Sequence, residues 1–232
     1  MIDTLIYIAD DKHLYSKEGY QAVTPRTNGK NLPILMLVSD DVRLADPAPL
    51  LKQLPRGAFV LLRSKSDKKL KSLAGKIIPS AHKLGLRVLI AGPVRLAHAL
   101  GADGAHINEA LIKRRAIHNI WPGAGRHNGA LRKGFILSAS AHGRAGLMRA
   151  KDAGVDFVLL GHAFASQSHP DTPALGVIRF CLLASQSPVP VVAIGGLNKT
   201  NARARRLTLR RLGGGGNNVV GMAGIGMFGG QK

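Results

Sequence analysis

Short apolar runs alternate with longer polar stretches along most of the chain. Each run has four or five residues without strict alternation, which is typical of strands buried on both faces of a parallel sheet. The eight runs are Ile34 to Val38, Ala58 to Leu62, Arg87 to Ile90, Gly104 to Ile107, Phe135 to Ala139, Phe157 to Leu160, Val191 to Ile194 and Val219 to Met222. Eight strands with helical crossovers favour an α/β fold, a (β/α)8 or TIM barrel with a parallel eight-stranded sheet, over an open doubly wound sheet.

The polar stretches between the runs carry helical spacing. The clearest are Asp67 to Leu84 and Ala141 to Ala153, and the second is followed by Gly154, a typical helix stop. Residues 1–31 precede the first strand, so we interpret them as an N-terminal extension and residues 32–232 as one barrel domain. The four glycines of Gly213 to Gly216 predict a flexible turn before the last strand.

The formal net charge of +20 comes from 33 Lys and Arg against 13 Asp and Glu. A field of this sign attracts polyanions. The basic residues are spread over several segments, however, aromatic residues make up only 4% of the chain, and no nucleic-acid-binding motif is present. We therefore expect no specific nucleic-acid partner, and we interpret the charge as solvated helix faces that also attract phosphorylated small molecules.

The lengths of the apolar runs and the cysteine content indicate the cellular compartment of the protein. No run approaches the roughly 20 residues that a membrane span needs, and the first twenty residues lack the basic start and apolar core of a secretory signal. The single cysteine, Cys181, cannot form an internal disulfide. We expect a cytoplasmic protein with no membrane partner. The sequence leaves the oligomeric state open.

Candidate chemistry is expected at the carboxyl ends of the strands, where function lies in parallel barrels. Arg63 and Lys65 follow the second run and offer positive charge, and Ser140 follows the fifth run and offers a hydroxyl. Gly195 and Gly196 follow the seventh run, where glycines allow backbone N–H groups to approach an anion. These residue types together predict a phosphate site at this end of the barrel.

Four segments resemble the thiamine phosphate synthase family. PVPVVAIGGLN, from Pro188 to Asn198, is similar to the family's PIPVVAIGGI strand and glycine turn. GHAFASQSHPDTPALG is similar to its G-x-x-F-x-T-x-T-K-P loop, which ends at a glycine. ALGADGAHI resembles the GADGVHL segment, and LLRSKS resembles the Q-L-R-x-K strand. The resemblance runs from about Pro33 to the end, and it implies the same TIM barrel.

The family condenses hydroxymethylpyrimidine diphosphate with thiazole phosphate to thiamine phosphate and pyrophosphate, with the help of Mg2+. The resemblance implies these two phosphorylated heterocycles as small-molecule partners. It also assigns roles to individual positions. The residues that would bind the diphosphate, here called the diphosphate side, include Arg63, Lys65 and Ser140. In the loop after the sixth run, Ser166 and Ser168 stand in place of the family's threonines, and His169 stands in place of its lysine. The thiazole phosphate side is Gly195 and Gly196, with the backbone around Ala223 and Gly224.

The chain departs from the family at the metal ligands. The Asn-Asp pair after the third strand is Ala91 and Gly92 here, and the second metal carboxylate falls at Leu111. No Asp or Glu occurs between Lys68 and Ala102. Because a departing diphosphate needs its charge neutralised, two hypotheses follow.

The first hypothesis is a relocated Mg2+ site, built from Glu109 with Asp40 or Asp41. The second is a metal-free site, in which Arg63, Lys65 and protonated His169 neutralise the leaving group.

An alternative function is a catalytically impaired or repurposed relative. One form is a thiazole tautomerase-like enzyme in which His169 or His106 moves a proton, and another is a phosphate-ligand-binding protein. Loss of the metal carboxylates favours this alternative. Retention of Arg63, Lys65 and the serines favours the synthase, because a tautomerase has no need for a diphosphate clamp.

Overall fold

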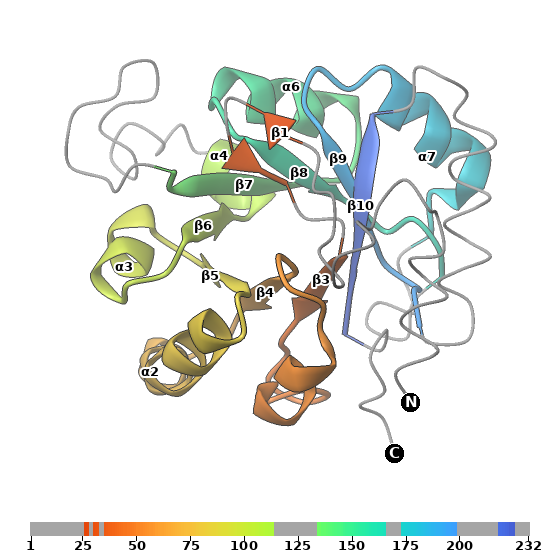
Figure 1. Cartoon of the computed structure of the whole chain (residues 1–232). Helices are drawn as coiled ribbons and strands as arrows, with labels where there is room; N and C mark the ends of the chain where they lie inside the picture. The colour runs from red at the N-terminus through yellow and green to blue at the C-terminus, as the bar shows by residue number, and fades with distance from the viewer. Residues whose placement is uncertain are drawn as a thin grey trace.

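Eight parallel strands close into a barrel in the computed structural model, which describes residues 26–27, 30–32, 35–113, 134–165, 173–198 and 218–225 (Figure 1). Their order around the ring is β10-β3-β4-β5-β6-β7-β8-β9. The strands are β3 Leu35–Val38, β4 Phe59–Leu62, β5 Arg87–Ala91, β6 Gly104–Ile107, β7 Ile136–Ala141, β8 Phe157–Leu160, β9 Val191–Ile194 and β10 Val219–Gly224. The predicted (β/α)8 barrel with a parallel eight-stranded sheet is confirmed.

Three strands continue further than the apolar pattern predicts. β5 includes Ala91, β7 continues through Ser140 to Ala141, and β10 ends at Gly224. The ladder between β7 and β8 pairs Ser140 with Leu159, so pairing extends past the point where the apolar run ends. We call the open end of the barrel at the carboxyl ends of the strands the mouth. Polar and small residues that line it still belong to the strands. Ser140 therefore lies on a rigid strand rather than in the following loop.

Helices surround the ring of strands (Figure 1). They are the 3-10 helix η1 Ala48–Gln53 and the α-helices α2 Asp67–Lys83, α3 Val94–Ala99, α4 Glu109–Lys113, α6 Arg144–Asp152 and α7 Gly176–Ser185. The hydroxyl of Ser66 accepts a hydrogen bond from the Lys69 N–H at 3.3 Å, which caps α2. α6 begins at Arg144, later than predicted, because Ala141 is the last residue of β7 and His142 and Gly143 connect the strand to the helix. In the described ranges, no helix is long and apolar enough to cross a membrane.

Two apolar layers hold the barrel together. The outer layer lies between strands and helices and includes Leu70, Ile77 and Phe180. The inner layer fills the barrel, where Phe59 and Phe157 meet edge to face with ring centroids 6.3 Å apart. Side chains that alternate inward along β6 and β7 change from apolar to polar toward the strand ends. The barrel is therefore a packed core with a polar mouth.

The segment before β3 is attached to the opposite, amino-terminal end of the barrel. β1 Arg26–Thr27 and β2 Lys30–Asn31 pair antiparallel. The Lys30 ammonium lies 3.0 Å from Asp156, which directly precedes β8, and Leu32 is buried with the inner layer. The last residues of the predicted N-terminal extension thus contact the barrel, while residues 1–25 lie outside the described ranges.

Candidate functional site

The ends of β3 and β4 are joined through Ser39 and Arg63. The Ser39 hydroxyl accepts the Arg63 N–H at 2.9 Å and donates to the Arg63 carbonyl at 3.2 Å. The Ser39 N–H donates to the Leu61 carbonyl at 2.9 Å. Because Ser39 is fully buried and satisfied by these contacts, the backbone that carries Arg63 is held firmly at the barrel mouth.

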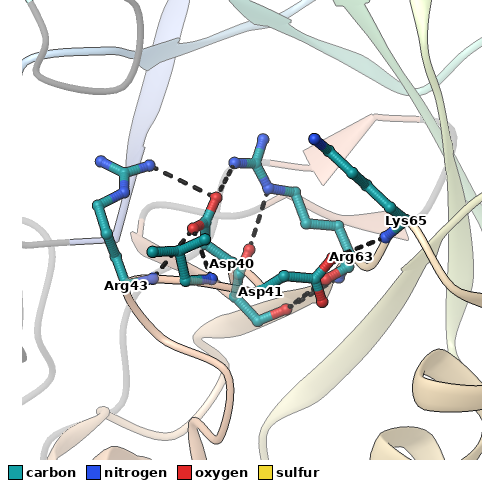
Figure 2. A network of polar contacts seen from close by, with 7 residues as sticks. Asp40, Asp41, Arg43, Arg63 and Lys65 are labelled. Atoms are coloured by element: carbon teal, nitrogen blue, oxygen red, sulfur yellow. Dashed lines mark hydrogen bonds and ion pairs between the residues drawn. The ribbon is translucent and has the colours of Figure 1, made fainter.

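The guanidinium of Arg63 is held along one edge (Figure 2). Its Nε–H donates to the Ser39 carbonyl at 3.0 Å, and its Nη2 donates to Asp40 Oδ2 at 2.5 Å. The other oxygen of Asp40 accepts the N–H groups of Val42 and Arg43, both at 3.1 Å. About 40% of the Arg63 side chain is exposed. The edge formed by Nη1 and the second proton of Nη2 makes none of these contacts.

Asp40 is ionised in this network. Burial opposes its charge, but the Arg43 N–H, the Arg63 guanidinium and the Val42 N–H outweigh burial and hold the pKa of Asp40 far below its usual range. Arg43 adds a longer ion pair, with Nη2 3.6 Å from Asp40 Oδ2. The carboxylate is therefore a fixed negative group next to Arg63.

Lys65 lies two residues beyond Arg63, and its backbone is fixed by Asp41. The Lys65 N–H donates to Asp41 Oδ2 at 2.8 Å. This bond, with a further hydrogen bond from the Ser64 side chain, lowers the pKa of Asp41. Figure 2 shows the exposed Lys65 side chain extending alongside Arg63. The structure thus places the two predicted cations of the diphosphate side together.

Ser140 lies next to a buried histidine of the neighbouring strand. His106 of β6 has Nε2 2.9 Å from the Ser140 hydroxyl and Nδ1 3.0 Å from the Ser138 hydroxyl. Burial lowers the pKa of His106 to about 4, and the positive charge of Arg63 adds to this shift. The ring is thus neutral near pH 7. Ser140 and His106 thus form one hydrogen-bonded unit at the ends of β7 and β6.

A second polar cluster follows β6, β7 and β8, and the sequence reading missed its geometry. Glu109, the first residue of α4, has Oε2 2.6 Å from His142 Nδ1 and Oε1 2.6 Å from Arg149 Nη2. The rings of His142 and His162 lie 5.9 Å apart. His142 comes one residue after β7, and His162 comes two residues after β8. This position at the carboxyl ends of strands is the sequence signal by which the cluster could have been found. Glu109 is thus engaged by two basic side chains.

The loops after β8 and β9 pack tightly against each other. The Ala163 N–H donates to the Ile194 carbonyl at 2.8 Å, and the Phe164 N–H donates to the Gly195 carbonyl at 3.3 Å. Gly195 and Gly196 have φ angles of +102° and +65°. A Cβ on Gly196 would stand 2.2 Å from the Ala165 carbonyl oxygen. That side of Gly196 therefore faces the β8 loop, and glycine is required there by loop packing as well as by backbone conformation.

The remaining predicted phosphate groups are placed differently. Ala223 and Gly224 lie inside β10, where Ala223 is paired with Met36 and Gly224 with Leu37 of β3. Ala223 is fully buried in the inner layer. β10 ends at Gly224, and Ile225 is the last residue that the structure describes. Ser166, Ser168 and His169 lie outside the described residues, so their predicted roles stay predictions.

The described side chains do not form a site that fits Mg2+. Ala91 and Gly92 supply no side-chain oxygen, and Leu111 packs on the outer apolar layer. Asp40 binds Arg63, Glu109 binds Arg149, and their strands β3 and β6 are separated by two others in the ring. In the part of the chain that the structure describes, no three His, Cys, Asp or Glu side chains gather closely enough to hold a metal ion. The relocated-site hypothesis stays a prediction.

The fold and the mouth define a class of protein, a (β/α)8 barrel with arginine and lysine at the carboxyl end of β4 and serine at that of β7. A family model described as thiamine monophosphate synthase matches residues 35–209. The chain therefore belongs to the thiamine monophosphate synthase family.

Individual relatives agree with this membership. A thiamine-phosphate synthase of Chlorobium luteolum is 27% identical over 180 residues, which cover 75% of this chain and 79% of that protein. A thiamine-phosphate synthase of Roseiflexus sp. is 31% identical over 132 residues, covering 56% of this chain and 52% of that protein, so this match spans about half of each. A solved structure, thiamine phosphate pyrophosphorylase from Pyrococcus furiosus, is similar with a TM-score of 0.58 and 21% identity, covering 82% of this chain and 84% of that one. At this identity the structural likeness supports the fold.

Proposed function

We propose that this chain condenses hydroxymethylpyrimidine diphosphate with thiazole phosphate, forming thiamine phosphate and pyrophosphate in thiamine biosynthesis. The observation that carries the proposal is the pair of cations that Arg63 and Lys65 form side by side after β4, at the end of the barrel where the Ser140 hydroxyl is held by His106. Family membership supplies the identity of the substrates. These are charged small molecules, and we also propose that the protein acts on them in the cytoplasm.

In this reaction the bond between the pyrimidine methylene carbon and the diphosphate oxygen breaks, and the carbon gains a bond to the thiazole nitrogen. The electron pair leaves with pyrophosphate, so no proton has to move in the bond-forming step. The protein must place the two rings and stabilise the charge that grows on the leaving oxygen. Arg63 and Lys65 supply fixed positive charge for that purpose, and Ser140 supplies a hydroxyl hydrogen bond.

His106 does not suit the alternative role of a proton-transfer base. Its two ring nitrogens are already paired with Ser138 and Ser140, and its pKa of about 4 keeps the buried ring neutral. A base that acts near pH 7 works best with a pKa near that value. We assign His106 the task of holding the Ser140 hydroxyl in place, which also serves binding of the diphosphate.

Kinetics of single variants test the proposal. Arg63→Gln should lower kcat/KM for thiamine phosphate formation about 100-fold, the usual cost of removing one donor to a developing negative charge. Arg43→Gln is the matched control, because Arg43 is also paired with Asp40 but only at 3.6 Å. It should stay within about threefold of the wild type, as for a surface ion pair. Equal losses in both variants would remove Arg63 from the site.

A further inference from the structure

We propose that Asp40 is a positioning residue for Arg63, which it holds so that one edge of the guanidinium points toward the leaving diphosphate. The inference rests on the proposed function, because it names how the proposed diphosphate ligand is presented with its cation. Asp40 itself need not touch substrate.

The geometry of the guanidinium supports this role. Arginine has five N–H groups in a rigid plane. One edge, made of Nε and Nη2, is taken by the Ser39 carbonyl at 3.0 Å and by Asp40 Oδ2 at 2.5 Å. The two acceptors come from consecutive residues, and they fix both the direction and the plane of the group. The other edge, made of Nη1 and the second proton of Nη2, is then available for a bidentate contact with phosphate oxygens.

Asp40 is itself held in place, which a positioning group requires. Its Oδ1 accepts two backbone N–H groups, from Val42 and Arg43, while Oδ2 faces Arg63. The carboxylate is mostly buried, with 17% of its side chain exposed, whereas Arg63 is 40% exposed. The anchored partner is thus Asp40, and the partner that reaches into solvent is Arg63. An anchored carboxylate with an exposed cation is the arrangement expected when the carboxylate orients the cation for an incoming ligand.

The negative charge of Asp40 and its proposed positioning role predict opposite effects of its removal on diphosphate affinity, so an experiment can distinguish them. A carboxylate repels a diphosphate, so its removal should strengthen anion binding. If Asp40 orients Arg63, its removal should weaken binding instead, because the long side chain must then be ordered at each binding event. Asp40→Asn suits the test, since the amide oxygen can still accept the Val42 and Arg43 N–H groups while the amide nitrogen cannot accept from Arg63.

Calorimetry with inorganic pyrophosphate is the first measurement. Asp40→Asn should raise the Kd about fivefold relative to Asp46→Asn, as expected for an ion pair at a partly exposed site. Asp46→Asn removes the same charge from the same connection between β3 and η1, where Asp46 binds Lys76. In an Arg63→Gln background, Asp40→Asn should not weaken binding further. Tighter or unchanged binding by Asp40→Asn would overturn the inference while leaving the proposed function intact.

NMR of the Arg63 side chain is a second measurement, and its wild-type result alone can overturn the inference. In the ligand-free protein, the Arg63 Nε–H and Nη protons should give separate nitrogen-correlated NMR signals, because both bonds hinder rotation of the group. Asp40→Asn should merge the Nη signals, and Asp46→Asn should not. Averaged Arg63 signals in the wild type would overturn the inference. If Arg63→Gln leaves pyrophosphate affinity unchanged, the diphosphate role of Arg63 fails, and the inference fails with it.

Discussion

Replacing Gly196 with alanine probes the close approach of the β8 and β9 loops. The added Cβ would stand 2.2 Å from the Ala165 carbonyl oxygen, 2.8 Å from Phe164 Cβ and 2.9 Å from the Phe164 carbonyl carbon. Two of these neighbours are backbone atoms, so they cannot rotate away as a flexible side chain would. Gly154 provides a matched control, since its φ of +67° nearly equals the +65° of Gly196 and nothing lies within 4 Å of its Cβ position.

The two substitutions share one cost and differ in the other. A left-handed conformation costs an L-residue roughly 1–2 kcal/mol, and the reduced freedom of the unfolded chain returns about 0.4–1 kcal/mol. Gly154→Ala should therefore lower the free energy of unfolding by about 1 kcal/mol. Gly196→Ala adds overpacking, which typically costs about 1–3 kcal/mol. We expect a total of about 2–4 kcal/mol for Gly196→Ala, with displacement of the β8 loop.

Urea denaturation of the wild type and both alanine variants measures the difference directly, provided that the slope with denaturant is the same in all three. The free energy of unfolding should fall further in Gly196→Ala than in Gly154→Ala by about 1–3 kcal/mol. Equal losses would refute the reasoning, because backbone strain alone would then explain both and the two loops would not meet. Binding of thiazole phosphate should weaken only in Gly196→Ala.

Three further predictions follow from the buried histidine, the metal positions and Glu109. His106 has a folded pKa of about 4 against 6.5 for a free histidine, so its contribution to stability is complete above pH 6.5 and is lost as the pH falls toward 4, by at most about 1.4 kcal/mol per pH unit. His106→Gln should flatten that part of the pH profile of stability, and an unchanged profile would contradict the burial of a neutral ring. Magnesium should bind the ligand-free protein only in the millimolar range or worse, as measured by calorimetry, and appreciable affinity should require diphosphate, whose oxygens are ligands that Mg2+ prefers. Tight binding without diphosphate would show that Asp40, Asp41 and Glu109 do converge. Glu109→Gln should lower the melting temperature by a few degrees, because it weakens the contacts with Arg149 and His142 that join α4, α6 and the end of β7. No change in melting would mean that this cluster contributes nothing to stability.

The sequence predicts the barrel well because its strands are buried on both faces and read as continuous apolar runs. β6 Gly104–Ile107, β8 Phe157–Leu160 and β9 Val191–Ile194 coincide with the predicted runs. The runs end too early at β7 and β10, where small and polar residues pair as strand residues inside the mouth. Periodicity alone has no means to distinguish such a strand end from a loop.

The candidate site is predictable only in part, because partners across the ring are not visible in the sequence. Arg63 and Ser140 could be named from their positions after apolar runs. The pairing of Arg63 with Asp40 depends on β3 and β4 being neighbours, and the contact of His106 with Ser140 depends on the register of β6 against β7. The sequence predicts that Gly196 is a glycine because phosphate must approach its backbone, whereas the structure adds the close Ala165 carbonyl oxygen as a second reason.

The most direct test of the proposed function is product analysis with the purified protein. The protein would be incubated with hydroxymethylpyrimidine diphosphate, thiazole phosphate and Mg2+, and thiamine phosphate and pyrophosphate would be quantified together. We predict that both products form in equal amounts and that Arg63→Gln slows both by the same factor of about 100. Absence of thiamine phosphate, under conditions in which calorimetry shows that both substrates bind, would contradict the central claim that this barrel mouth carries out the condensation.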